Sequence, residues 1–313
     1  MKLNKQLQFA MRKILCLALI AVMCMPMHIS AFEVSNGNDY TNRLGISISA
    51  SDYRQLLQQG LDEIDIDHLD EEAYTRYMAE TDGELIVKAD SYYVCSKDGR
   101  NIEVPENQAK AIASNINTGT MPVEDEAAYD SASDGVCKMT LILYKTGNSY
   151  RSTTRVIWPT IPPMEGQDVL SITHNQGLIT NTRSVTTSLF FDWASPTGIM
   201  TYTDEAASIT SQVGAGAVCK FNRVKYPSIL NGTYTYKVEM YSSKNSSDIT
   251  TATLQSDFYR GIEKLNASLS INAIAIIESV VTGSLSSIVS ILPTYSKSFA
   301  EVLQSSVFYT INP

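Results

Sequence analysis

The feature that most constrains this fold is a series of short β-forming segments between residues 136 and 259. They are "VCKMTLILYK", "SYRSTTRVIW", "QDVLSITH", "LITNTRSVTTSLFF", "EAASITSQVGAGAVCKF", "TYTYKVEMYS" and "DITTATLQSDFY". Each is rich in Val, Ile, Thr, Tyr or Phe, and turn-forming Asn, Gly, Ser and Pro separate them. Because no long helices alternate with these strands, we predict an α+β protein with an antiparallel β-sandwich-like core.

This β-rich domain is expected to span residues 84–272, with one inserted helix. The helix is indicated by apolar residues at helical spacing from Ala109 to Ile116, and Asp98-Gly99 marks a hairpin turn before it. Gly214 and Gly216 fall inside a segment read as one strand, which predicts a bulge or a close backbone approach.

A small helical unit is expected before the β domain, within residues 32–83, after a flexible lead-in. Its first helix starts at Ser49 or Ser51 and stops or kinks at Gly60. A second short helix is indicated from Leu69 to Tyr77, with three acidic residues in its first turn, where the helix dipole favours negative charge. Two such helices have little core of their own, so we expect them to pack on the β domain.

The segment from Leu265 to Leu292 contains one charged residue, Glu278. Apolar residues first alternate, as in a strand, and then recur every three or four positions from Ile274, as in a helix. We predict a last strand that runs into an amphipathic helix ending at Pro293, and a further helix marked by Tyr295, Phe299, Val302 and Leu303. Residues 273–313 would thus form a helical segment packed on the β domain.

The N-terminus reads as a signal peptide spanning residues 1–31. Four basic residues precede the apolar run Ile14–Met23, which is too short to span a bilayer, and Ala31 offers a cleavage site. Met11 is an alternative translation start, and an uncleaved anchor is the alternative to cleavage. We expect a protein that is secreted or associated with the cell envelope.

The net charge of the mature chain restricts the classes of partner that it can bind. The leader holds four of the 24 basic residues and none of the 33 acidic ones, so the mature chain is strongly acidic. Such a surface repels phosphate backbones, which argues against nucleic acid as a partner. Contact with a membrane is not favoured, because no basic cluster is present to attract anionic lipid.

Three cysteines remain after the leader. Cys95 and Cys137 both lie in strand-like segments and could form a disulfide, which would add about 2–4 kcal/mol. The alternative is that both, like Cys219, are small buried apolar residues.

The histidines do not form a recognisable catalytic or metal site. Asp168 lies six residues before His174 on one predicted strand, about 20 Å away, so the two cannot act as a pair. His68 lies in "DEIDIDHLDEE", where Asp65 and Asp67 fit a calcium loop but Leu69 and Asp70 do not. We therefore expect an ordinary hydrogen-bonded His174, a solvated acidic face around His68, and no metal or other cofactor.

Aromatic residues supply the candidate ligand contacts. "SLFFDWASP" places Phe191, Trp193 and Pro196 before a turn, and Trp158 precedes another turn. Exposed rings there would provide a stacking surface for sugars or peptides, whereas the alternative is that they belong to the sandwich core.

Two elements resemble a group of uncharacterised secreted proteins of Gram-positive bacteria. The first comprises Tyr53, Leu56-Leu57, Gly60-Leu61 and Ile64, followed by Glu71-Glu72 before Tyr74; the second comprises Trp158, Ile161, Pro162 and Asp168. The chain departs from the group at Leu61, Glu165 and Gln167, where Phe, Arg and an aromatic residue are expected. The resemblance covers about a third of the chain and implies only localisation and broad architecture.

The leading hypothesis is an exported, non-catalytic protein that binds an extracellular or cell-wall ligand. A membrane-active or pore-forming protein, with residues 265–292 leaving the core, is the first alternative, because Ser/Thr-rich alternating segments suit barrel strands. A secreted hydrolase with a site built from distant acidic residues is the second.

Overall fold

The computed structural model describes residues 39–96, 101–118, 133–158, 166–195, 198–204, 208–213, 215–223, 233–261 and 299–310. The predicted leader, its cleavage site and the segment 265–292 lie outside these residues.

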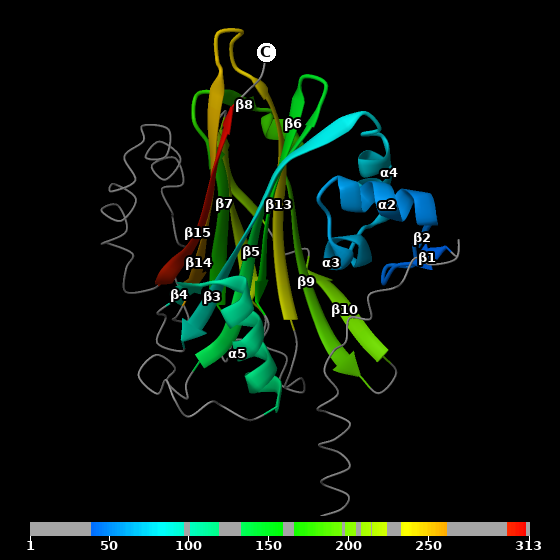
Figure 1. The fold of residues 1–313 in the computed structure, drawn as a ribbon, viewed down its shortest axis with the longest axis vertical. Helices are drawn as coiled ribbons and strands as arrows, with labels where there is room; N and C mark the ends of the chain where they lie inside the picture. The colour runs from blue at the N-terminus through cyan, green and yellow to red at the C-terminus, as the bar shows by residue number, and fades with distance from the viewer. Residues whose placement is uncertain are drawn as a thin grey trace, which may run out of the picture.

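Two antiparallel sheets stack face to face, as the sequence predicted (Figure 1). The eight-stranded sheet has the order β10-β9-β13-β6-β5-β3-β4, with β8 also pairing with β13, and the five-stranded sheet has the order β11-β12-β7-β14-β15. The strands of the first sheet are β3 (Gly83–Ser96), β4 (Asn101–Val104), β5 (Ser133–Thr146), β6 (Ser149–Trp158), β8 (Leu178–Thr180), β9 (Thr186–Ser195), β10 (Gly198–Asp204) and β13 (Thr233–Lys244). Those of the second are β7 (Gly166–His174), β11 (Ser208–Val213), β12 (Gly216–Arg223), β14 (Thr251–Gly261) and β15 (Phe299–Thr310).

The core lies between the sheets. Strands β5, β6, β9 and β13 contribute one side and β7, β12 and β14 the other, each by alternate residues, as the two-residue period of a strand requires. Aromatic rings dominate its centre, where Tyr236 packs against Phe221 and Phe258 with ring centroids 5.3 and 5.1 Å apart.

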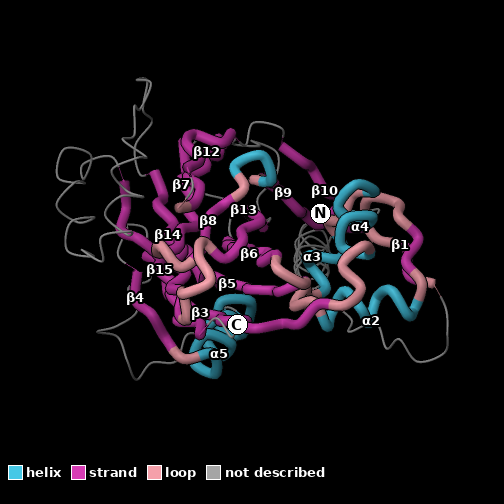
Figure 2. Tube along the Cα trace, turned by 90° about the horizontal axis from the view of Figure 1, so that it is seen from above, coloured by secondary structure: helices cyan, strands magenta, loops and turns pink. Residues whose placement is uncertain are grey.

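A helical layer covers the other face of the eight-stranded sheet (Figure 2). Helices α2 (Ala50–Gln58), α3 (Glu63–Asp67) and α4 (Glu71–Met78), with the short strands β1 (Tyr40–Thr41) and β2 (Ser47–Ile48), form the helical unit. Helix α5 (Glu106–Thr118), the expected inserted helix, packs on β3 and β5 through Ala109 and Ile112.

Local sequence explains how the helical unit is built. Ser49 caps α2 by accepting a hydrogen bond from the Asp52 amide, and Asp62 and Asp65 form a capping box at α3. The chain turns sharply after α2 at Gly60, whose φ is 92°. A Cβ there would lie 2.9 Å from Leu85 Cδ1, so glycine is also needed for close packing on β3.

Three details of the sequence prediction are wrong. Residues 299–310 form strand β15 instead of a helix. Phe299, Val302 and Leu303 match helical spacing over only five residues, whereas the segment as a whole pairs along β14 from Gly261↔Phe299 to Thr251↔Thr310. That long-range pairing decides the structure.

The segment expected as one strand around Gly214 and Gly216 forms two strands, β11 and β12. The close backbone approach predicted there is confirmed, because a Cβ on Gly216 would lie 2.3 Å from the Ile172 carbonyl oxygen. Neither α3 nor β10 was predicted as a separate element.

Candidate functional site

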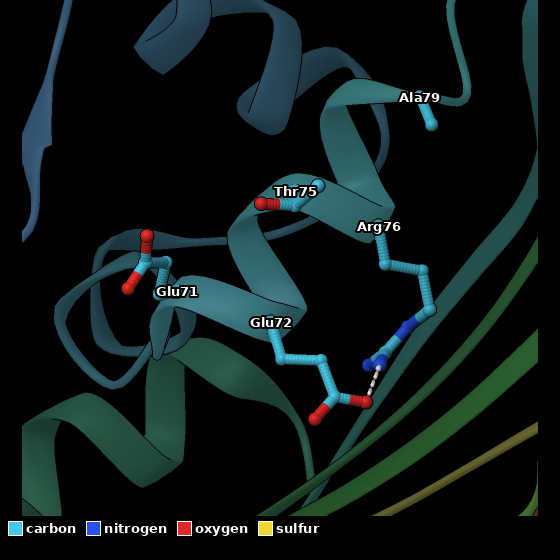
Figure 3. Close-up of a pocket in the computed structure, with 5 residues that line it drawn as sticks. All are labelled: Glu71, Glu72, Thr75, Arg76 and Ala79. Atoms are coloured by element: carbon cyan, nitrogen blue, oxygen red, sulfur yellow. Dashed lines mark ion pairs between the residues drawn. The ribbon is translucent and has the colours of Figure 1, made fainter.

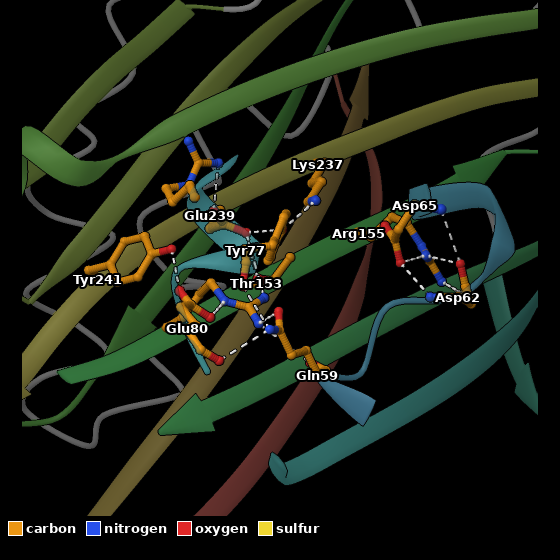
Figure 4. A network of polar contacts seen from close by, with 12 residues as sticks. Gln59, Asp62, Asp65, Tyr77, Glu80, Thr153, Arg155, Lys237, Glu239 and Tyr241 are labelled. Atoms are coloured by element: carbon orange, nitrogen blue, oxygen red, sulfur yellow. Dashed lines mark hydrogen bonds and ion pairs between the residues drawn. The ribbon is translucent and has the colours of Figure 1, made fainter. Parts of the chain in front are cut away.

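The most chemically distinctive region is a buried polar interface between the helical unit and the eight-stranded sheet (Figure 4). We call its centre the polar clamp. It consists of Gln59, Arg76, Tyr77 and Glu80 from the helical unit and Arg151, Thr153, Lys237, Glu239 and Tyr241 from the sheet. The sheet residues alternate with core residues along β6 and β13, so one face of each strand is apolar and the other carries charges.

Arg151 fills the middle of the polar clamp. Its side chain is 1% exposed, and its Nε donates a hydrogen bond to Glu80 Oε2 at 3.0 Å. The guanidinium also lies over the Tyr77 ring, 4.4 Å from the centroid. Tyr241 Oη donates to the other Glu80 oxygen at 2.6 Å. The carboxylate that follows α4 is thus held by two groups of the sheet.

Glu239 is the second buried carboxylate of the polar clamp, after Glu80. It accepts hydrogen bonds from Arg76 Nη2 at 3.0 Å, from Thr153 Oγ1 at 3.2 Å and from Tyr77 Oη. Lys237 Nζ donates to Tyr77 Oη at 2.8 Å. The C-terminal end of α4 and Glu80 beyond it are therefore joined to β6 and β13 by charged or charge-assisted contacts, which are stronger than neutral ones.

The charges in the polar clamp stabilise one another. Burial by itself would raise the pKa of Glu239, but Lys237, Arg151 and Arg76 outweigh it and lower that pKa. Burial, together with the charge of Glu239, raises the pKa of Tyr77 well above its usual range, so its hydroxyl stays protonated and can donate. The Tyr77 hydroxyl therefore serves as a donor to the Glu239 carboxylate.

A second cluster holds the acidic segment around α3. Arg155, which is 1% exposed, donates to the carboxylates of Asp62 and Asp65. Burial would raise the pKa of Asp65, yet Arg155 and Lys237 lower it. The expected solvated acidic face is therefore wrong for Asp62 and Asp65, which face the sheet and pair with Arg155 on β6. It holds for the exposed Asp70, Glu71 and Glu72.

A third cluster surrounds His68, which stacks on Phe190 at a ring distance of 4.2 Å and contacts Asp192 Oδ2 at 3.0 Å. Arg43 bridges Asp192 and Asp67 at 2.7 and 2.9 Å. Burial, with repulsion from Asp192 adding to it and the interaction with His68 opposing it, raises the pKa of Asp67 to about 6. Among the residues that the structure describes, no group of three His, Cys, Asp or Glu side chains is arranged to hold a metal ion.

The arrangement around His174 is structural, as predicted. Its Nδ1 lies 2.9 Å from the Asn175 carbonyl oxygen and its Nε2 2.6 Å from Thr180 Oγ1. Burial lowers the pKa of His174. Asp168, at the other end of β7, accepts a hydrogen bond from Tyr236 Oη at 2.6 Å.

The aromatic candidates separate into two classes. Trp158 and Phe191 are 3% and 1% exposed and belong to the core, so the expectation that they contact a ligand at the surface is wrong for this conformation. Trp193 is only partly buried, near the end of β9, and stacks on Phe191 at 5.5 Å.

The cysteines lie on adjacent strands but not opposite each other. Cys137 pairs in register with Tyr93, and Cys95 pairs with Gly135. A disulfide between Cys95 and Cys137 therefore remains a prediction, for peptide mapping without reductant to test. Cys219 is a free buried thiol, and burial raises its pKa to about 12.

A shallow hollow lies on the exposed side of α4 (Figure 3). Its volume is about 640 Å³, and it is lined by Glu71, Glu72, Thr75, Arg76 and Ala79. It is open to solvent, and the figure shows Glu72 pairing with Arg76. The hollow is not a deep binding cavity.

Sequence reasoning missed Arg151, Arg155 and Glu239. The available signal was the sequence "RSTTR", which places two arginines on one face of a predicted strand, together with the acidic segment of the helical unit.

Comparisons with known proteins leave the family open. No family model matches the chain, and no curated protein matches it. Within the described residues, no helix is both long and apolar enough to cross a membrane.

Similarity to solved structures is weak. The pilus backbone protein RrgB from Streptococcus pneumoniae gives a TM-score of 0.28 at 13% identity, over 39% of this chain and 26% of that one. The collagen-binding subdomain of the Enterococcus faecalis surface protein ACE gives 0.28 at 9% identity, over 54% and 90%. The Clostridium perfringens NetB toxin in its membrane-inserted form gives 0.21 at 6% identity, over 40% and 78%.

Proposed function

We propose that this chain is an exported binding module that acts outside the cell or at the cell envelope, by contact instead of by reaction. The leader-like N-terminus supports export. The polar clamp supports a rigid body, because its titratable groups are held by fixed partners of opposite charge or by hydrogen bonds.

The observation that carries the proposal is the position of Trp193. Its ring is partly accessible at the rim of the sandwich, and stacking on the buried Phe191 fixes its orientation. The neighbouring Asp192 is held by Thr201 Oγ1 at 2.7 Å and by Arg43. A large aromatic ring fixed in this way loses little entropy on binding and is typical of a binding hot spot.

The ligand class follows from the chemistry of the ring. A partly accessible indole suits contact with the apolar face of a sugar ring or with a peptide side chain. The acidic surface disfavours nucleic acid, so a cell-wall or extracellular glycan or peptide is the proposed ligand.

The test is co-sedimentation of the chain from Phe32 with cell-wall sacculi or lipid vesicles, and affinity electrophoresis with soluble glycans. We expect binding to sacculi or to a glycan, and a loss of affinity of at least about tenfold in Trp193→Ala. Ile179→Ala is the control, because Ile179 is 46% exposed on β8 of the same sheet.

Each other outcome counts against the proposal. Equal binding by Trp193→Ala and wild type would exclude this contact, and no binding in any of these assays would exclude the module. Vesicle binding with release of trapped dye would favour the membrane-active alternative.

A further inference from the structure

Strand β10 forms one edge of the eight-stranded sheet, next to the strand that carries Trp193. It pairs with β9 over all 7 of its residues without a register shift, and none of the described strands pairs with its other side. This edge lies at the lower right of the sheet, beside β9 (Figure 1). An unpaired edge presents a row of backbone donors and acceptors, to which another extended chain can bind.

The register shows which backbone groups point to the unpaired side. Only two residues separate β9 from β10, so Ser195 and Gly198 form a hydrogen-bonded pair, and such pairs recur at every second residue of an antiparallel ladder. The residues between these pairs, Ile199, Thr201 and Thr203, direct their N–H and C=O groups away from β9. The donors and acceptors on the unpaired side thus repeat at intervals of about 7 Å.

The other three sheet edges carry features that hinder pairing, whereas β10 does not. Strand β4 is 4 residues long, exposes Glu103 and ends before Pro105. Strand β11 is bulged between Ile209 and Ser211, and β15 lies close to β3 and β5 of the facing sheet. Charges, prolines, bulges and covering elements are the ways in which proteins protect an edge. The sequence of β10, "GIMTYTD", has no proline and no charge before Asp204.

An extended peptide fits this edge better than a glycan or a second copy of the chain does. A glycan has no backbone that repeats N–H and C=O groups at the spacing of a strand. Two copies joined antiparallel through β10 would be related by a two-fold axis perpendicular to the sheet, which places both helical units on the same face. Each unit exposes Asp70, Glu71 and Glu72, and the whole chain is acidic, so two copies would repel each other. A neutral or basic peptide meets no such repulsion.

We propose that β10 binds an extended, neutral or basic peptide segment of an extracellular partner as an additional strand of the sheet. This deepens the proposed function and rests on it, because it selects a peptide among the proposed ligands and states how the peptide binds. Main-chain hydrogen bonds to Ile199, Thr201 and Thr203 supply the affinity. Trp193 lies about two strand spacings, or about 10 Å, from the added strand, so it contributes where the peptide has a side chain long enough to reach across β10.

Amide exchange in the monomeric wild-type chain tests whether the edge is unpaired. We expect the amides of Met200 and Tyr202 to be protected by β9, and those of Ile199, Thr201 and Thr203 to exchange at least about tenfold faster. Equal protection of both sets in the monomer would show that another part of the chain covers the edge, and would overturn the proposal. Protection gained only in a dimer would overturn it too, and would assign the edge to a second copy.

A phage-displayed library of random ten-residue peptides, selected on the immobilised wild-type chain, supplies the probe for binding. We expect a selected peptide to bind and to slow exchange at Ile199, Thr201 and Thr203. Thr203→Pro removes one outward N–H but no bond to β9, so we expect at least about a tenfold loss of affinity. Thr203→Val keeps that N–H and is the matched control, with the affinity of wild type. Thermal melting checks that both variants are folded.

N-methylation of the selected peptide provides a readout that needs no variant of the chain. Methylation of one set of alternate amides is expected to lower the affinity at least about tenfold, and methylation of the other set to leave it unchanged. Equal effects of the two sets, or a library that yields no peptide sensitive to Thr203→Pro, would overturn strand addition. Binding to sacculi or a glycan that depends on Trp193 but not on Thr203→Pro would overturn strand addition alone and leave the proposed function in place.

Discussion

Both faces of strands β6 and β13, at the centre of the eight-stranded sheet, carry buried residues but are stabilised in different ways. Along β13, Val238 faces the sandwich core and is 0% exposed, whereas its neighbour Glu239 faces the helical unit and is 1% exposed. The inner face packs apolar and aromatic groups, which tolerate changes that conserve volume. The outer face joins specific charges, and each becomes costly when its partner is removed. We infer that the inner face determines how compactly the two sheets pack, whereas the outer face determines where the helical unit docks.

The largest expected effect is at the outer face. Glu239→Ala leaves Arg76, Arg151 and Lys237 without their shared carboxylate, so we expect a loss of about 3–5 kcal/mol in the free energy of unfolding. Urea denaturation measures it. Glu72→Ala is the control, since its side chain is 90% exposed and its pair with Arg76 spans 4.0 Å; we expect a change within about 0.5 kcal/mol. If both substitutions changed the free energy of unfolding equally, the buried ion pairs would be no more important for stability than the exposed pair.

At the inner face, we expect the free energy of unfolding to depend on side-chain volume instead of charge. Leu170→Ala creates a cavity beside Cys219 and Phe258 and costs about 2–5 kcal/mol, whereas Leu170→Met costs less than about 1.5 kcal/mol. The same denaturation experiment checks both. If Leu170→Met were as damaging as Leu170→Ala, the inner face would be as specific as the outer one.

A smaller effect is expected from pH at the third cluster. The pKa of Asp67 is raised to about 6 in the folded chain, so the folded state takes up a proton between about pH 6 and 4 and the unfolded state does not. This contribution stabilises the fold as the pH falls through that range and is lost as the pH rises, by at most about 3 kcal/mol. We expect the melting temperature of Asp67→Asn to lack this gain, relative to wild type, between pH 7 and 5. An identical pH profile in both proteins would contradict the assignment to Asp67.

Below about pH 4 the effect of pH on stability reverses, and the fold loses stability as the pH falls. The pKa values of Asp192 and Glu239 are lowered in the folded chain in spite of burial, by His68 and Thr201 in one case and by Lys237, Arg151 and Arg76 in the other. Their contribution to stability is present above the unfolded pKa and is lost as the pH falls through the folded one.

The sequence predicted the sandwich because alternation and turn residues are local signals. The hairpin between β5 and β6, for example, turns at Gly147, whose φ is 57°. The sequence did not predict β15, because its partners on β14 lie about 40 to 60 positions away, from Gly261↔Phe299 to Thr251↔Thr310. It also did not predict the polar clamp, since Arg151 contacts Glu80 and Gln59 across 71 and 92 positions. The local pattern "RSTTR" indicates two arginines on one strand face but does not identify their partners, so the sequence led to the prediction that the acidic segment around His68 is solvated.

The sequence also could not tell which aromatic candidate on β9 is buried and which is accessible. Phe191 and Trp193 have equivalent places in the strand period and both point toward the inner face. Trp193 lies nearer the end of β9 and is only partly buried, whereas Phe191 is 1% exposed.

The docking role of the polar clamp is tested most directly by a double-mutant cycle between the helical unit and the sheet, using Arg151→Ala, Glu80→Ala and the double variant in urea denaturation. Because Arg151 Nε and Glu80 Oε2 are 3.0 Å apart and buried, we expect a coupling free energy of about 2–3 kcal/mol. Additivity within about 0.5 kcal/mol would show that the two residues do not stabilise each other, and would contradict the polar clamp as the element that docks the helical unit.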